Sequence, residues 1–294
     1  MPPRNQLYII LAAVLWGTTG TAQAFAPAGA QPDTIGALRM AIGGGALLLV
    51  SLARGGFRNS RPWPVRATLL AGGSMAAYQP LFFAGVAATG VAVGTVVTIG
   101  SAPVLAGLLA VTVRGERPGR RWFGATALAI AGCALLLSER SALTVDFVGV
   151  VLALGAGLAY ALYSVTGKRL LETQPPDIAM APVFGLAALI LAPALFRNNL
   201  QWLLLPSGLA AMLHLGLLAT ALAYLLFARG LQAVPVSHAV TLTLAEPLTA
   251  ATLGLVVLGE RLTAPALLGV ALILSGLVLL SARRTPRHRG GQLG

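Results

Sequence analysis

The sequence predicts an all-α integral membrane protein with ten transmembrane helices, arranged as two inverted repeats of five helices. Its 294 residues are 57% hydrophobic and only 10% charged, with a mean hydropathy of +0.84. Soluble domains carry about a quarter charged residues, so this composition excludes an ordinary soluble enzyme and a disordered chain. Ten apolar segments and an internal repeat supply the rest of the prediction.

A transmembrane helix needs about 20 mostly apolar residues, and ten stretches of the chain meet this requirement. Glycines inside these stretches allow helices to approach closely in lipid. Only two residues, Thr89 and Gly90, separate the third stretch from the fourth. The loops are short and leave no room for a soluble catalytic domain. The ten ranges are 7–26, 34–53, 67–88, 91–113, 122–138, 147–167, 178–196, 207–228, 235–258 and 264–282.

The basic residues predict the orientation of the chain. The net charge is +12, and with the N-terminus in the cytoplasm 16 of the 20 Lys and Arg residues fall on the cytoplasmic side. Cytoplasmic loops retain positive charge, so both termini are expected inside, and no nucleic-acid partner is expected. Ala22-Gln23-Ala24 imitates a signal-peptide cleavage site, but an even number of spans and the repeat require a retained first helix.

The two halves of the chain align without gaps when the sequence is shifted by 144 residues. The matched pairs include Pro32-Asp33 with Pro176-Asp177, Pro103 with Pro247, and Gly115-Glu116-Arg117 with Gly259-Glu260-Arg261. Because each half holds five spans, the second half must cross the membrane in the opposite sense. Inverted repeats are typical of secondary transporters, whose substrate site lies where the halves meet. We expect repeats at residues 1–140 and 141–284, followed by a basic cytoplasmic tail at 285–294.

Several local motifs agree with a known family. They are Trp16-Gly17, Leu38-Arg39, Pro103, Gly115-Glu116-Arg117, Glu246-Pro247, Leu258-Gly259-Glu260-Arg261-Leu262 and the helix with Gly269 and Gly276. In these motifs, and over nearly its whole length, the chain resembles the drug/metabolite transporter superfamily with tandem EamA-type halves. The resemblance implies ten helices, a central cavity and export from a bacterial inner membrane. Bacterial exporters of aromatic and other neutral amino acids look nearest in length and layout.

Polar and aromatic side chains recur at helical spacing on the apolar segments, as expected of residues lining an interior path. Trp16 and Tyr160 occupy equivalent positions in the two repeats. The alternative is that hydroxyls bond back to their own helices and aromatic rings pack between helices or at the interface. The candidate substrate-binding residues are Trp16, Thr19, Gln23, Arg39, Tyr78, Gln79, Phe82, Phe83, Thr98, Ser101, Tyr160, Tyr163, Ser164, His214, Tyr224, Thr243 and Glu246.

Ionisable residues inside a span are costly unless paired or hydrated, so each is a functional candidate. Glu246 suits proton coupling or binding of a substrate amine; alternatively it accepts N–H groups freed near Pro247. Arg39 either snorkels to the interface, clamps a carboxylate or pairs with a buried acid. His214 is either a packing residue or a ligand or proton relay. Pro103 and Pro247 are candidate gating hinges, with static kinks as the alternative.

The predicted function is secondary, non-ATP export of small organic metabolites, amino acids including aromatic and neutral ones, by alternating access. An exporter of drugs, amines or nucleosides is the alternative within the family, and a non-transporting receptor or assembly protein is the alternative class. Intramembrane enzyme motifs and the Gly-x-x-x-x-Gly-Lys-Ser/Thr motif of ATP-driven pumps are absent from the sequence. The single cysteine excludes a disulfide framework, and no metal or cofactor is expected. Proton coupling and the oligomeric state are left open.

Overall fold

The computed structural model describes residues 3–56, 62–137, 146–259 and 263–281, and all the regular elements within these ranges are helical. The first half of the chain contains α1 (Pro3–Gly17), α2 (Thr19–Ala24), α3 (Pro32–Ala53), α4 (Val65–Thr89), α5 (Val91–Arg114) and α6 (Arg120–Leu137). The second half contains α7 (Phe147–Leu170), α8 (Pro176–Leu191), η2 (Ala192–Phe196), η3 (Gln201–Leu204), α9 (Pro206–Leu213), the π-helical η4 (His214–Leu222), α10 (Ala223–Leu231), α11 (Val236–Leu242), η5 (Thr243–Ala245), α12 (Glu246–Val257) and α13 (Ala264–Ser281).

Nine helices of the described part are long and apolar enough to cross a membrane. The tenth predicted span is α6, an 18-residue helix that begins at Arg120 and packs along α13. The expected ten-helix bundle is therefore confirmed. The third and fourth spans are separated where the sequence predicts it: α4 ends at Thr89 and α5 begins at Val91. Gly90 between them has a φ of +82°, a conformation that favours glycine.

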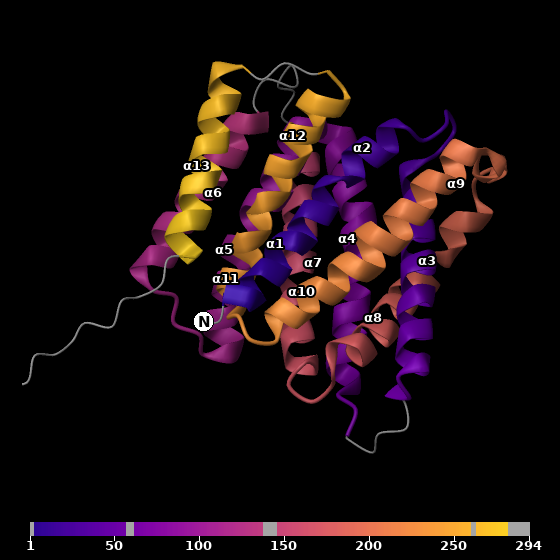
Figure 1. Ribbon diagram of the computed structural model, residues 1–294, viewed down its shortest axis with the longest axis horizontal. Coiled ribbons are helices and arrows are strands. Elements are labelled where there is room, and N and C mark those ends of the chain that lie inside the picture. Colours follow the sequence, from indigo (N-terminus) through magenta and orange to yellow (C-terminus); the bar gives the residue numbers. More distant parts are fainter. Residues whose placement is uncertain (1–2, 57–61, 138–145, 260–262, 282–294) are drawn as a thin grey trace, which may run out of the picture.

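The two halves of the chain cross the bundle in opposite directions. The chain enters α1 at the lower end of the bundle in Figure 1, whereas its repeat copy α7 begins at the upper end. Two helices, α3 and α6, pack against their own copies, α8 and α13, at the two sides of the bundle (Figure 1). Between these pairs, α4 packs against α7 as α10 packs against α1. The inverted repeat is thus visible in the packing.

Individual contacts obey the same symmetry. At the lower end, Arg54 forms an ion pair with Asp177 at 2.7 Å. At the upper end the repeat-related residues, Asn198 and Asp33, meet through hydrogen bonds of 3.1 Å. The Pro-Asp pairs recognised in the sequence therefore begin α3 and α8, and each aspartate ties its helix to the end of the other.

The α6–α13 pair depends on glycine at its contact points. A Cβ added to Gly132 would meet the carbonyl oxygen of Gly269, and one added to Gly276 would meet the carbonyl oxygen of Ala125. These two contacts exchange under the 144-residue repeat. Small residues at such points let backbones approach closely, which stabilises helix pairs in lipid.

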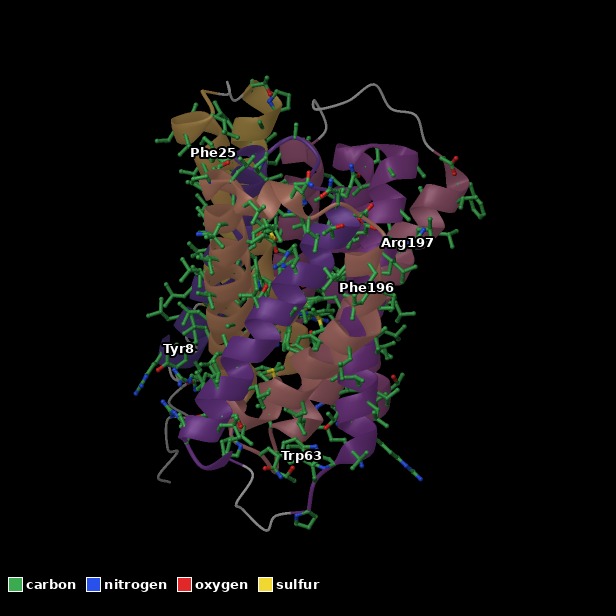
Figure 2. The ribbon with its side chains drawn as sticks, turned by 90° about the vertical axis from the view of Figure 1, so that its right-hand side faces the viewer. Tyr8, Phe25, Trp63, Phe196 and Arg197 are labelled. Carbon is green, nitrogen blue, oxygen red and sulfur yellow. The ribbon has the colours of Figure 1, made fainter. Side chains whose placement is uncertain are left out.

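The outside of the bundle is apolar. Phe147, Leu189 and Val256 are each at least 74% exposed, as expected for side chains that face hydrocarbon rather than water. Figure 2 shows Phe25 at one end of the bundle and Trp63 at the other. Aromatic side chains at both ends match the membrane–water interfaces, where such rings are enriched.

The seventh span ends in the short 3-10 helix η2, and three other described spans are interrupted away from their ends; the sequence marks only one of these three with a proline. The first span breaks at Thr18 between α1 and α2, the eighth becomes π-helical in η4, and the ninth passes through η5 before α12. Pro247 follows the last break, as a hinge there requires, but α5 continues without interruption through its repeat mate Pro103.

Candidate functional site

The three helix interruptions meet at one place inside the bundle. A Cβ on Gly17, at the end of α1, would lie 2.7 Å from the carbonyl oxygen of Glu246, where α12 begins. Thr18, at the break itself, contacts His214 at the start of η4. Irregular backbone at membrane depth is tolerated where it is buried in protein or lines a cavity, and discontinuous helices mark the substrate sites of many transporters. The breaks therefore point to a functional centre here.

Beside this place lies the aromatic cluster, a group of seven rings contributed by both halves of the chain. The ring of Trp16 contacts those of Tyr224 and Tyr160, with distances of 4.8 Å and 6.1 Å between ring centroids. The closest pair is Phe184 and Tyr224 at 4.5 Å. The members come from α1, α4, α7, α8 and α10: Trp16, Tyr78, Tyr160, Tyr163, Phe184, Tyr224 and Phe227.

Glu246 is the acidic group of the site. It lies within electrostatic reach of Arg39 on α3, Tyr78 on α4, Tyr160 on α7 and Tyr224 on α10. Its carboxylate is buried, although the residue as a whole is only partly so. Within the described part of the chain, the carboxylate accepts no hydrogen bond, and Arg39 supplies the opposite charge that acts on it.

Arg39 is held by the π-helical segment. The side chain is only 9% exposed; its Nε donates to Thr220 Oγ1 at 3.1 Å and one terminal nitrogen donates to the Ala219 carbonyl at 3.3 Å. Thr220 in turn donates to the carbonyl of Leu215, five residues earlier, at 2.8 Å. Arg39 is thus directed into the bundle, which overturns the snorkelling alternative. The sequence signals that could have revealed this contact are a buried arginine and a threonine on facing spans.

Two donors of the aromatic cluster have no acceptor. The indole Nε1 of Trp16 and the hydroxyl of Tyr160 are buried without a hydrogen-bond partner, and these residues are 6% and 9% exposed. Thr243 lies beside the Tyr160 hydroxyl and donates its own proton to the carbonyl of Val240 at 2.7 Å, so towards Tyr160 it can act only as an acceptor. Buried donors are nearly always paired in folded proteins, so the indole N–H of Trp16 stands out as a buried donor to which the described residues supply no acceptor.

His214 belongs to a second, upper part of the site. Its Nε2 lies 2.7 Å from Thr18 Oγ1, and Thr18 donates its own proton to the carbonyl of Leu15 at 2.7 Å. The imidazole must therefore donate through Nε2. Here a cavity of about 390 Å³ lies between α2, α9, η4 and α12. Its lining residues are Thr18, Thr21, Ala22, Phe25, Ser207, Ala210, Ala211, His214 and Leu253.

The remaining predicted residues lie around this centre. Thr98 donates to the carbonyl of Ala153 at 3.1 Å, and Ser164 donates to that of Tyr160 at 2.9 Å, so neither hydroxyl is free. Gln79 faces Gly36 on α3. Ser101 lies against Gly157 in the α5–α7 contact, Phe82 stacks on Tyr78, Phe83 lies against Phe82, and Thr19 and Gln23 are half-buried on α2.

Sequence reasoning missed Phe184, Phe227 and Thr18. Phe227 lies three residues after Tyr224 on the same helix face, so helical spacing could have revealed it. Thr18 and Phe184 carry no such signal, because the break in the first span and the approach of α8 depend on tertiary packing. Among the residues that the structure describes, no three His, Cys, Asp or Glu side chains form a group that could hold a metal ion.

At the lower end of the bundle the two halves are joined by a set of contacts, the lower latch, formed by Arg114, Glu116, Glu172 and Ser237. Glu116 accepts from the backbone N–H groups of Val236 at 2.9 Å and Ser237 at 3.3 Å, and from the Ser237 hydroxyl at 3.1 Å. Arg114 pairs with Glu172 at 2.7 Å and with Glu116 at 3.7 Å. Glu116 therefore holds the start of α11 through its backbone, as expected for a structural turn, and joins the first repeat to the second.

These features define a class of protein: a ten-helix integral membrane protein with an internal polar site between two inverted repeats. The model of the EamA-like transporter family matches the chain twice, over residues 4–138 and 147–282. The chain belongs to this family, within the drug/metabolite transporter superfamily, and is a multi-pass membrane transporter.

Related proteins cover almost the whole chain. It is 49% identical over 277 residues to the uncharacterized transporter YwfM of Bacillus subtilis (strain 168), across 94% of this chain and 93% of that protein. It is 31% identical over 282 residues to the threonine/homoserine exporter RhtA of Escherichia coli (strain K12), across 92% and 88%. A solved crystal structure with 23% sequence identity has a TM-score of 0.81 and covers 94% of this chain and 95% of that one, which shows a shared fold.

Proposed function

We propose that this protein exports small neutral amino acids and similar metabolites across a bacterial inner membrane by alternating access. The observation that carries the proposal is the position of Glu246, a buried carboxylate between the two repeats, at the meeting point of three helix interruptions and beside the aromatic cluster. The full-length similarity to a threonine/homoserine exporter supports an amino-acid cargo.

Alternating access is supported by the difference between the two ends of the bundle. The lower latch ties the repeats together at one end, whereas the cavity beside His214 lies towards the other. We assign the lower end to the cytoplasm, because the basic loops lie there, and both termini with it. In this arrangement the site is closed to the cytoplasm, and export requires the lower latch to open.

Counterflow in proteoliposomes tests the proposal. Vesicles containing purified protein and loaded with unlabelled threonine should accumulate labelled threonine from outside, while protein-free vesicles should not. Amines, nucleosides and the aromatic amino acids are assayed in parallel, because an exporter of drugs or amines is the alternative. Counterflow of amines or nucleosides without any amino acid would replace the proposed cargo, and failure of every solute would remove the transport proposal.

A further inference from the structure

We propose that the central site recognises its cargo as a zwitterion, with Glu246 as the counter-ion of the ammonium group, and with Trp16 Nε1 and the Tyr160 hydroxyl as donors to the carboxylate. This assignment rests on the proposed function and adds to it the chemical class of the cargo and its orientation.

The first argument is the set of unmatched groups. The Glu246 carboxylate accepts no hydrogen bond from the described residues, and two buried donors, Trp16 Nε1 and the Tyr160 hydroxyl, have no acceptor. A buried polar group without a partner costs free energy. One solute carrying both an ammonium group and oxygen acceptors would satisfy all three groups at once.

The second argument is the fixed position of Arg39. Two of its nitrogens already donate to Thr220 and to the Ala219 carbonyl, and the π-helical segment η4 holds these acceptors in place. These bonds use two of its five N–H donors and hold the guanidinium beside η4. The guanidinium therefore balances the charge of Glu246 from a distance.

The third argument is net charge. Glu246 and Arg39 together carry no net charge, so a neutral zwitterion adds none to a poorly solvated site, whereas a free cation or anion does. The rings of Tyr160 and Tyr224 lie 6.1 Å and 4.8 Å from the Trp16 ring between centroids, and aromatic faces attract cations such as an ammonium group. The combination favours an α-amino acid over a simple amine or an organic acid.

Equilibrium binding to the purified full-length protein in detergent tests this assignment, with three probes that differ at one end. Threonine carries both charges, threoninol lacks the carboxylate, and N-acetylthreonine lacks the ammonium group. We expect threonine to bind most tightly and N-acetylthreonine at least tenfold more weakly. In Glu246→Gln, threonine should lose at least tenfold in affinity, and the preference over N-acetylthreonine should disappear.

The donor variants are read against a matched control. Tyr160→Phe and Trp16→Phe should each weaken threonine binding about three- to tenfold and leave threoninol nearly unchanged, because each removes one neutral hydrogen bond to the carboxylate. Trp202 also has a buried indole Nε1 without a partner, but it packs against Gly208 outside the site. Trp202→Phe should therefore leave the binding of all three probes unchanged.

The assignment would be overturned if the wild-type protein bound threonine and N-acetylthreonine with equal affinity, or bound none of the probes. It would also be overturned if Glu246→Gln kept the wild-type preference for threonine over N-acetylthreonine. In the donor variants, a loss of threoninol affinity as large as the loss of threonine affinity would contradict it. Binding with the expected preferences but without counterflow would uphold the assignment and refute the proposed transport. Counterflow of threonine with no effect of Glu246→Gln would do the reverse.

Discussion

Glu246 begins α12, where its own backbone N–H already donates to the carbonyl of Thr243 and Pro247 has no N–H. A carboxylate inside a bundle needs a balancing charge, and Arg39 supplies it. At the scale of single residues, the site thus depends on this pair of opposite charges.

Transport should respond to pH through this carboxylate. Acidification on the side that the site faces protonates Glu246 and removes the counter-ion of the ammonium group, so wild-type transport should fall as the pH falls. Glu246→Gln should transport at least tenfold more slowly and show a flatter pH profile, measured as counterflow at a series of pH values. An unchanged rate and profile would remove Glu246 from the mechanism.

The charged and aromatic residues of the candidate site could be predicted from the sequence. A charged side chain inside an apolar span costs free energy, and the aromatic rings recur at helical spacing. The structure brings Glu246, Arg39, Trp16 and Tyr160 into one region. Thr18 and Phe184 could not be predicted, because their place depends on how helices distant in the sequence approach each other.

At the scale of helices, the span limits could be predicted from composition, but most interruptions could not. The prolines predicted candidate hinges at Pro103 and Pro247; the helix type changes just before Pro247, whereas α5 stays helical through Pro103. The π-helical segment η4 contains no proline that would predict it from the sequence. Within it, the Thr220 hydroxyl donates to the carbonyl of Leu215, five residues earlier, and accepts from Arg39 Nε.

The α6–α13 contact should be sensitive to a single methyl group. In Gly132→Ala the new Cβ would meet the backbone carbonyl of Gly269, so the helices must separate, at a cost of about 1–3 kcal/mol. Thermal unfolding in detergent should show a lowered midpoint. Gly124→Ala, on the same helix, is the matched control, because its Cβ meets only the end of Leu279 at 3.6 Å. Equal midpoints for the two variants would contradict this account of the contact.

At the scale of the whole molecule, the lower latch joins the two repeats and must open during export. Glu116→Gln weakens the charge-assisted bonds to the start of α11, so the lower end should open more often. A cysteine at Val234, which is fully buried, should then react several-fold faster with a maleimide, in a background where the native Cys133 is replaced by alanine.

Glu172→Gln is the control for this measurement. Glu172 is half-exposed in its pair with Arg114, and exposed ion pairs contribute little, so this variant should change the labelling rate far less. Equal rates in Glu116→Gln and the parent protein would show that the lower latch does not limit opening.

The central claim is that two copies of a five-helix unit cross the membrane in opposite directions. Gly119 and Thr263 are repeat mates, both exposed, and each precedes the last helix of its unit. Single cysteines at these positions, in the Cys133→Ala background, can be labelled with a membrane-impermeant maleimide in intact cells and in inverted vesicles. We predict that Thr263→Cys reacts only in intact cells and Gly119→Cys only in inverted vesicles. Reaction of both cysteines from the same side would contradict the inverted repeat.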